Sequence, residues 1–291
     1  MQSIKHDLEN NGYLVIPNIL NSHEIKEYRH EFNKWIKTID NLDTFHSLIN
    51  SNGIFKYHEV GHQRFAWLLR TNPKIIDIFK LIWDTDSLVT SFDGCCYYPT
   101  NYNGTPSCWT HSDQSSIKKG RHCIQSFVSL TSNTERTFIV YEGSHKLHEE
   151  HSKTYNIEDP SDWYMINQDY LETIHHKKKI LDISAGSLVL WDSRTFHQNT
   201  CGEPDCKEER LVQYLCYLPK NNIINDKLMQ TKREYYFNTL RTTNHYPYPM
   251  TPVSLQSKLY NYNNNSDIYI DYNSLSTPYL DDLLDKIEHL L

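Results

Sequence analysis

The stretch that decides the fold is Trp109-Thr110-His111-Ser112-Asp113, in which an imidazole and a carboxylate stand two residues apart. Successive side chains of a β-strand point to opposite faces, so residues two apart share one face. A strand over residues 108–113 therefore turns His111 and Asp113 in the same direction. One imidazole and one carboxylate arranged in this way can bind a single metal ion together.

A second histidine lies far downstream, in Trp191-Asp192-Ser193-Arg194-Thr195-Phe196-His197, after a turn at Ala185-Gly186 and an apolar strand. Two histidines and one carboxylate on one side of an ion leave the opposite positions open, which is typical of non-heme Fe(II) oxygenases. Arg210 opens a further predicted strand, and its planar guanidinium suits a carboxylate such as the far end of a 2-oxo acid. The residues thus predict an iron site with a neighbouring anion site.

Short strands dominate the middle of the chain, separated by clusters of Pro, Gly and Asn. We expect strands over residues 87–98, 108–113, 122–130, 137–141, 179–183, 187–192 and 210–218. Many short strands with helices mostly outside them indicate a β-rich α+β fold, a double-stranded β-helix or cupin-type jelly roll with N-terminal, inserted and C-terminal helices. We expect a single domain over 1–291, with its core at about 87–219 and helical additions over 1–86 and 220–291.

Capping signals place the N-terminal helices. Asn21 is followed three residues later by Glu24, a pattern that predicts a helix running to about Asp40. Asn72-Pro73 combines an N-cap residue with a first-turn proline and predicts a helix through about Trp83.

Three further segments are expected to be helical: an inserted, partly helical excursion over 145–178, residues 223–243, and an amphipathic helix from Thr277-Pro278 to Leu291. Binding residues tend to lie on loops held by a rigid scaffold. We therefore expect the excursion and residues 223–250 to wall the open side of the barrel and set substrate choice. The candidate contacts there are Tyr164, Arg241 and His245.

Composition narrows the class of partner. The net charge is −7, and the 29 basic and 36 acidic residues are interspersed, so no basic stripe favours nucleic acid. No apolar run is long enough for a signal peptide or a membrane span, which predicts a cytoplasmic protein without a membrane partner. Seven cysteines without framework spacing fit reduced thiols. A small molecule is the expected substrate, and the oligomeric state is not indicated.

The motifs form a recognisable set. They are residues 12–20 (GYLVIPNIL), His111-Ser112-Asp113-Gln114, residues 125–131 followed by Tyr141-Glu142-Gly143-Ser144-His145-Lys146, and residues 185–197 followed by Asn199 and Arg210. Over roughly residues 12–219, the chain resembles the phytanoyl-CoA hydroxylase-like family of Fe(II)/2-oxoglutarate-dependent dioxygenases. Two positions depart from the family pattern. Glu135-Arg136-Thr137 stands where a Gly pair is usual, and Asn199 stands where Ser is common.

The resemblance implies specific roles for the quoted residues. Fe(II) is bound by His111, Asp113 and His197, and 2-oxoglutarate chelates it through the 1-carboxylate and 2-oxo group. Arg210 pairs with the 5-carboxylate of this co-substrate. With O2, the implied reaction hydroxylates an unactivated C–H bond and releases succinate and CO2. Asp113 favours hydroxylation, because family members that halogenate have a small residue at that position.

Four more residues are expected around this centre. Asn199 can donate a hydrogen bond to a carboxylate and is a candidate cofactor contact. Gln125 is either a cofactor contact or part of a buried hydrogen-bond network. Trp191 and Arg194 are candidate substrate contacts, and a structural ion pair is the other interpretation of Arg194.

Alternatives from another functional class remain open. The chain could be a non-catalytic or zinc-filled jelly-roll binding protein, for example with zinc held by His197, Cys201 and Cys206. That hypothesis leaves His111, Asp113 and Arg210 unexplained.

A second histidine cluster is also ambiguous. It consists of His145, His148 and His151, with Glu149 close to them, at roughly helical spacing. Such a cluster could bind zinc, but mixed polar runs usually face water, so we favour a solvated helix face.

Overall fold

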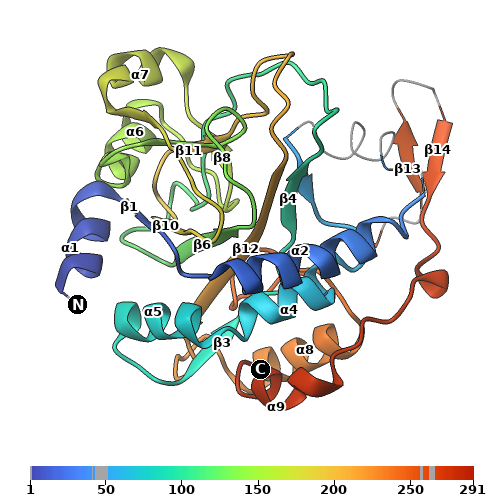
Figure 1. Ribbon diagram of the computed structural model, residues 1–291. Helices are drawn as coiled ribbons and strands as arrows, with labels where there is room; N and C mark the ends of the chain where they lie inside the picture. The colour runs from blue at the N-terminus through green and yellow to red at the C-terminus, as the bar shows by residue number, and fades with distance from the viewer. Residues whose placement is uncertain (1, 41, 43–51, 256–257, 262–265) are drawn as a thin grey trace. The chain divides into compact units, whose positions relative to one another are not determined.

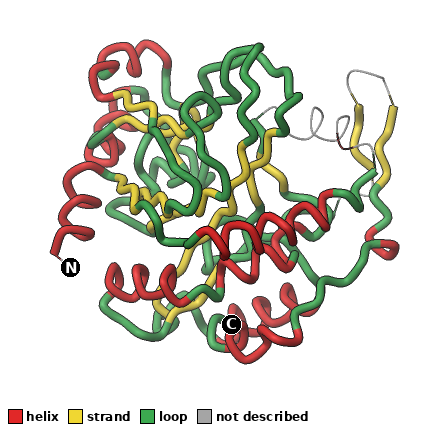
Figure 2. Tube along the Cα trace, in the orientation of Figure 1, coloured by secondary structure: helices red, strands yellow, loops and turns green. Residues whose placement is uncertain are grey.

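The computed structural model describes residues 2–40, 42, 52–255, 258–261 and 266–291 (Figures 1 and 2). The chain forms two compact units. The first unit comprises Met1–Asn18 and Tyr98–Arg210, and the second comprises Ile19–Tyr97 and Leu211–Leu291. A single domain over 1–291 stays a prediction.

The first unit contains two antiparallel groups of strands. One has the order β1 (Tyr13–Ile16), β10 (Leu188–Asp192), β6 (Ile124–Ser129). The other has the order β8-β5-β11-β7-β9. Its strands are β8 (Tyr164–Met165), β5 (His111–Ser112), β11 (His197–Asn199), β7 (Phe138–Tyr141) and β9 (Lys178–Ile180).

Aromatic side chains fill the space between these two sheets. The rings of Phe127 on β6 and Phe138 on β7 meet edge to face, with centroids 5.3 Å apart. Trp191 on β10 lies 5.0 Å from Phe138 and 5.3 Å from His197 on β11. Strands β6 and β10 are buried along their whole length, as expected of strands covered on both faces. His197, the second histidine of the predicted metal motif, therefore packs against the aromatic core of the first unit.

The excursion over 145–178 is partly helical, as the sequence predicts. It contains η2 (Ser144–Lys146), α6 (His148–Thr154), α7 (Gln168–Thr173) and η3 (His175–Lys177), together with strand β8. One residue separates η2 from α6 and one separates α7 from η3, whereas a longer segment that includes β8 joins α6 to α7. An N-terminal helix, α1 (Gln2–Asn11), completes the unit and has no counterpart in the sequence prediction.

The second unit carries most of the longer helices. The described α-helices of this unit include α2 (Ser22–Ile36), α4 (Arg64–Arg70), α5 (Pro73–Trp83), α8 (Lys227–Asn238) and α9 (Leu284–Glu288). Its short 3-10 helices include η1 (Val60–His62), η4 (Tyr272–Ser274) and η5 (Asp281–Leu283). Its strand pairs are β2 (Ile54–Phe55) with β4 (Cys95–Tyr98), β3 (Leu88–Thr90) with β12 (Arg210–Pro219), and β13 (Lys258–Asn261) with β14 (Ser266–Tyr269). Residues Tyr98 and Arg210, at the ends of β4 and β12, belong to the first unit.

Both predicted helix starts are confirmed. The Asn21 side chain accepts hydrogen bonds from the backbone of His23 and Glu24, and the Glu24 carboxylate accepts one from the Asn21 backbone at 2.7 Å. This reciprocal pair satisfies N–H groups that the first turn of α2 leaves without partners. Asn72 caps α5 in the same way through the backbone N–H of Lys74 at 3.0 Å.

Several expected elements are shorter than predicted, among them the strand expected over 108–113, which spans only His111–Ser112. Residues 87–98 form β3 and β4 rather than one strand, because Phe92 N–H donates to the Thr243 hydroxyl and leaves the ladder. The helix expected from Thr277 begins only at residue 281, and the carbonyl of the preceding Tyr279 accepts a hydrogen bond from Arg64 at 3.0 Å.

The prediction of a solvated histidine face is wrong. His148, His151 and His145 are all buried. His148 Nε2 lies 3.0 Å from the Gln114 carbonyl, and the His151 ring packs against Tyr170 and Phe196 at 4.8 and 5.5 Å. His145 lies in η2, and α6 turns His148 and His151 toward the interior of its unit.

Buried neutral histidines make stability depend on pH. Burial lowers the pKa of His151 to about 4, and burial together with Arg70 lowers that of His62 to about 3. Because the unfolded chain binds these protons near pH 6.5, this stability is complete above pH 6.5 and is lost as the pH falls toward 4. We expect denaturant unfolding to show a loss of roughly 3 kcal/mol from His151 alone between these values.

His151→Phe removes the titrating group and keeps an aromatic ring, so its unfolding free energy should fall less steeply with acid than that of the wild type. The exposed His176→Phe serves as the matched control and should retain the wild-type pH profile. Parallel profiles for wild type and His151→Phe would contradict the assignment.

None of the described helices is long and apolar enough to cross a bilayer. None of the seven cysteines forms a disulfide in the described structure. The cytoplasmic location expected from the sequence stays a prediction.

Candidate metal centre

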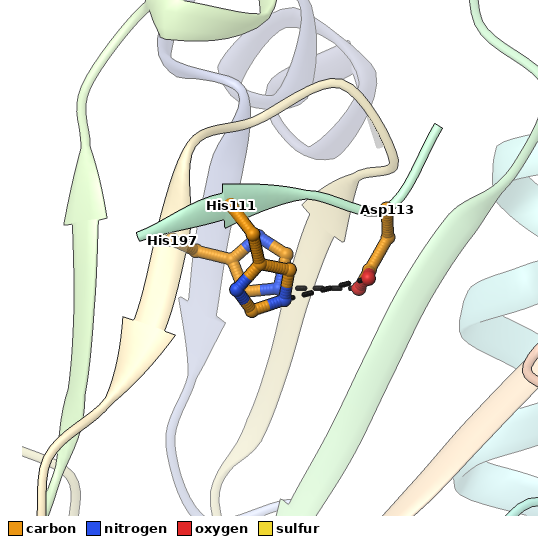
Figure 3. A group of neighbouring side chains, drawn as sticks. All are labelled: His111, Asp113 and His197. Atoms are coloured by element: carbon orange, nitrogen blue, oxygen red, sulfur yellow. Dashed lines mark ion pairs between the residues drawn. The ribbon is translucent and has the colours of Figure 1, made fainter. Parts of the chain in front are cut away.

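Three potential metal ligands converge in the first unit. His197 on β11 pairs directly with His111 on β5, so both imidazoles leave the same face, and Asp113 follows just after β5. Figure 3 shows the Asp113 carboxylate turned toward both rings. The Nε2 atoms of His111 and His197 lie 3.4 and 3.2 Å from its oxygens, and the three candidate ligand atoms all fall within 4.8 Å of one another.

These separations suit one shared ion. With bonds of about 2.1 Å, adjacent ligand atoms on a metal lie roughly 3 Å apart. Among the residues that the structure describes, no other group of three His, Cys, Asp or Glu side chains could hold a metal. The cluster around His148 and the combination of His197 with Cys201 and Cys206 are therefore not brought together as zinc sites.

Hydrogen bonds fix how each imidazole faces the centre. His111 Nδ1 lies 3.1 Å from the Trp109 carbonyl, and His197 Nδ1 lies 2.8 Å from the Thr195 carbonyl. A carbonyl only accepts, so each Nδ1 carries the hydrogen and each Nε2 turns a lone pair toward Asp113. Two lone pairs and a carboxylate aimed at one point repel one another, and a divalent cation at that point removes the repulsion.

The local electrostatics keep the ligands in forms that bind metal. Burial raises the pKa of Asp113, but the imidazoles of His111 and His197 outweigh it and hold this pKa well below its usual value. Burial, and then the proximity of His111, lowers the pKa of His197. A carboxylate and a neutral imidazole are the protonation states that a metal requires.

Gln125 donates a hydrogen bond to the carboxylate ligand, Asp113. Its Nε2 donates to Asp113 Oδ2 at 3.0 Å, and the Asp113 backbone N–H donates to the Ser193 carbonyl at 3.2 Å. These two bonds orient Asp113. A direct contact of Gln125 with a cofactor stays a prediction.

Trp109 is a residue of the site that the sequence analysis missed. Its indole stacks on the His111 ring at 4.7 Å with an interplanar angle of 15°, and its Nε1 donates to the Asn199 carbonyl at 2.8 Å. The sequence contains a signal for this contact, because Trp109 precedes His111 by two residues and its side chain therefore lies on the same face. The stack holds the His111 imidazole in place.

Arg210 presents a buried cation without an anion. Nη2 donates to Asn199 Oδ1 at 3.0 Å, Nη1 donates to the Arg136 carbonyl at 3.2 Å, and the guanidinium lies 5.2 Å from the Phe127 ring centroid. Nε is buried without a hydrogen-bond partner, and no carboxylate of the described chain pairs with Arg210. Burying such a charge is costly unless an anion compensates it. The residues therefore fit a dicarboxylate co-substrate.

Asn199 links the two parts of the site. It lies two residues after His197 on β11, so its side chain shares the face of the histidine. Through Asn199, the guanidinium of Arg210 is held on the side of the sheet that carries the metal ligands.

Arg136, which departs from the family pattern, fastens the loop before Arg210. Its buried guanidinium donates only to carbonyl groups. The acceptors are Pro99, Tyr102, Cys201, Cys206 and Glu208, at 2.5 to 2.9 Å. The long loop over 201–209 is thus anchored at both ends, and Arg136 also supplies the carbonyl that Arg210 contacts.

We expect Arg136→Lys to weaken binding of 2-oxoglutarate by about tenfold while Fe(II) affinity stays unchanged, because an ammonium cannot reach five acceptors and Arg210 loses its fixed position. Anaerobic titrations of the metal and of the co-substrate measure the two affinities separately. The exposed Arg121→Lys is the matched control. Equal losses of both affinities would show general destabilisation instead.

The two candidate substrate contacts, Arg194 and Trp191, have structural partners or a buried position. Arg194 forms a two-pronged ion pair with Asp192 at 2.8 and 2.9 Å, which is the structural interpretation of this residue. Trp191 is buried in the interior, and its Nε1 has no partner in the described structure. A substrate contact through either residue stays a prediction.

Of the three contacts expected on the covering segments, one lies in the first unit and two lie in the second, and their role stays a prediction. Tyr164 is buried, with its hydroxyl 3.3 Å from Ser152 Oγ. Arg241 and His245 lie in the second unit, where Arg241 donates to the Val253 carbonyl and His245 packs on Tyr246.

Comparison with known proteins gives a consistent result. The family model described as phytanoyl-CoA dioxygenase matches residues 8–200, more than half of the chain, including the three candidate ligands. The chain is 26% identical over 267 residues to Ava biosynthesis cluster protein O of Aspergillus versicolor, covering 84% of this chain and 85% of that protein.

Three solved structures share the fold. The epimerase SnoN, in complex with Fe3+, alpha ketoglutarate and nogalamycin RO, has a TM-score of 0.54 at 15% identity, over 75% of this chain and 83% of its own. EctD from S. alaskensis, with 2-oxoglutarate and 5-hydroxyectoine, has 0.55 at 14%, over 76% and 77%. HygX from Streptomyces hygroscopicus, with nickel, 2-oxoglutarate and hygromycin B, has 0.54 at 14%, over 76% and 88%. The predicted jelly roll with added helices is confirmed.

Proposed function

The chain belongs to the phytanoyl-CoA dioxygenase family, and from that premise we propose that it hydroxylates an unactivated C–H bond of a small molecule, using Fe(II), 2-oxoglutarate and O2. It is an enzyme of the 2-oxoglutarate-dependent dioxygenase class. The observation that carries the proposal is the convergence of His111, Asp113 and His197, whose ligand atoms lie within 4.8 Å of one another. Such a group binds one face of an ion and leaves the other face open.

Different residues of the chain would bind the metal and orient its ligands. His111, Asp113 and His197 would hold Fe(II), and Gln125 would keep the carboxylate ligand in orientation. Iron and 2-oxoglutarate supply the oxidising chemistry when they are bound, with succinate and CO2 as co-products.

Arg210 would pair with the distal carboxylate of 2-oxoglutarate, and Asn199 would align the guanidinium for that pair. The phenyl ring of Phe127 beneath the guanidinium excludes water from one side, which strengthens the charge interaction. Asp113 fills a ligand position that halogenating members of the family leave open, which favours hydroxylation.

Small molecules are supported as substrates by the structural neighbours, which are complexes with nogalamycin RO, 5-hydroxyectoine and hygromycin B. The rival proposal is a binding protein filled with zinc. The buried guanidinium of Arg210, which lacks a carboxylate partner in the described chain, argues against it, because a zinc-filled module has no use for a second anion site.

Anaerobic titration of the metal-free protein tests the proposal. We expect one Fe(II) per chain, binding of 2-oxoglutarate only after the metal, and slow succinate formation when O2 is admitted. Retention of zinc against excess Fe(II), with no succinate formed, would instead establish the binding protein.

A further inference from the structure

Strand β8 presents two faces of different character at the edge of the sheet that carries the candidate ligands. Met165 pairs directly with His111, and Tyr164 pairs with Ser112. Side chains alternate along a strand, so Met165 lies on the same face as His111 while Tyr164 points the other way. Trp163 directly precedes β8, and its ring also lies beside that of His111. Tyr164 is buried in an aromatic cluster with Phe196 and Tyr170. Strand β8 is thus anchored through Tyr164, on the face opposite to Met165.

The face shared with His111 is apolar and open. Trp163 is 47% exposed and Met165 is 49% exposed, although both side chains are large and apolar. The Trp163 ring lies 5.6 Å from the His111 ring at an angle of 33°. Large apolar side chains that stay exposed beside a site indicate a binding surface, because burying them against a ligand is favourable.

The segment before Trp163 is fixed by polar contacts. Asp162 forms an ion pair with Lys118 Nζ at 2.6 Å and accepts from the Ser115 backbone N–H at 3.0 Å. Ser115 Oγ also donates to the Asp159 carbonyl at 2.6 Å. The loop that follows Asp113 therefore holds Trp163 in position, and the exposure of its indole does not result from a loose segment.

We propose, on the premise of the function proposed above, that Trp163 and Met165 form a platform that binds a planar aromatic ring of the substrate beside the metal centre. The ring stacks on the free face of the indole and contacts the thioether sulfur.

The chemistry of the two side chains selects for aromatic ligands. An indole gains more from an offset-stacked or edge-on aromatic ring than from a saturated ring of equal area. A thioether also makes favourable contacts with aromatic rings. An aliphatic ligand would gain only the burial of its surface. The pair therefore distinguishes flat unsaturated rings from saturated ones, and a ring on Trp163 is delivered next to His111.

Two probes of matched size test this: 2-naphthol, which is planar and aromatic, and decahydro-2-naphthol, its saturated analogue. Calorimetry on the anaerobic protein with Fe(II) and 2-oxoglutarate measures their dissociation constants. Paramagnetic broadening of the probe protons, with the zinc-loaded protein as reference, measures proximity to the metal.

We expect the wild type to prefer 2-naphthol and to broaden its resonances. Trp163→Ala should weaken 2-naphthol binding by about tenfold and remove the preference, and Trp163→Phe should recover part of it. Affinities for Fe(II) and 2-oxoglutarate should not change. The exposed Tyr235→Ala, on α8 of the second unit, controls for loss of any surface aromatic residue.

The proposal is overturned if both probes bind equally, if neither binds, if Trp163→Ala retains the preference, or if no broadening occurs. Repeating the calorimetry on metal-free protein separates this failure from that of the proposed function. Absence of Fe(II) binding with an intact Trp163-dependent preference would refute the iron chemistry and keep the platform.

Discussion

Replacing Asp113 with alanine should lower Fe(II) affinity by more than about 100-fold and reduce succinate formation to background. Loss of an outer partner of a metal ligand already costs about 10–100-fold in affinity, so loss of a ligand costs more. The carboxylate is also the anionic member of the group, and without it the imidazoles of His111 and His197 meet the cation without charge compensation. Equilibrium dialysis with Fe(II) under nitrogen measures the first quantity.

The fold should survive this substitution. In the metal-free protein the half-buried Asp113 carboxylate faces the two imidazoles without a cation between them, and it accepts a hydrogen bond from Gln125. Thermal unfolding of Asp113→Ala without metal should therefore lie close to that of the wild type, and only the wild type should be stabilised by added Fe(II). The exposed Asp182→Ala provides the control for loss of a carboxylate. Wild-type Fe(II) affinity in Asp113→Ala would place the metal elsewhere.

The part of the site that could be predicted follows from the spacing of residues close together in the sequence. His111 and Asp113 could be assigned to one face because their separation of two residues matches the strand period, and Arg210 could be singled out by its place at a strand start. The helix caps at Asn21 and Asn72 were equally local, because a capping side chain bonds to the backbone within three residues. Signals of this kind do not depend on the rest of the fold.

The part that could not be predicted depends on neighbours distant in the sequence. The spacing of His145, His148 and His151 indicates one helix face but does not say whether water or aromatic rings lie against it. The sequence places Gln125 near the centre but does not say that its amide donates to Asp113. Five carbonyl groups surround Arg136, and none of them is recognisable from the sequence around it.

The strongest effect on co-substrate binding is expected at Arg210. Arg210→Lys keeps the charge but loses the planar fork, and we expect affinity for 2-oxoglutarate to fall by about 10–100-fold with Fe(II) affinity unchanged. Arg210→Met removes the charge as well and should lower the affinity further. Titration of 2-oxoglutarate into the anaerobic Fe(II) protein measures both variants.

A second 2-oxo acid makes this test specific. 2-Oxopentanoate has the same chelating end as 2-oxoglutarate but lacks the 5-carboxylate, so the wild type should bind it much more weakly. In Arg210→Met the two acids should bind almost equally, because the group that tells them apart is gone. A variant that merely distorts the centre would weaken both acids together, and a preserved preference for 2-oxoglutarate would assign the distal carboxylate to another residue.

Asn199 should act only through Arg210. Its Oδ1 accepts from Arg210 Nη2 at 3.0 Å, so Asn199→Ala frees the guanidinium to rotate and should weaken 2-oxoglutarate binding less than Arg210→Met does. In the double variant, Asn199→Ala should add almost nothing, since an amide that orients a guanidinium has no role once the guanidinium is absent. Full additivity in this cycle would mean that Asn199 contacts the co-substrate itself, the role expected from the sequence.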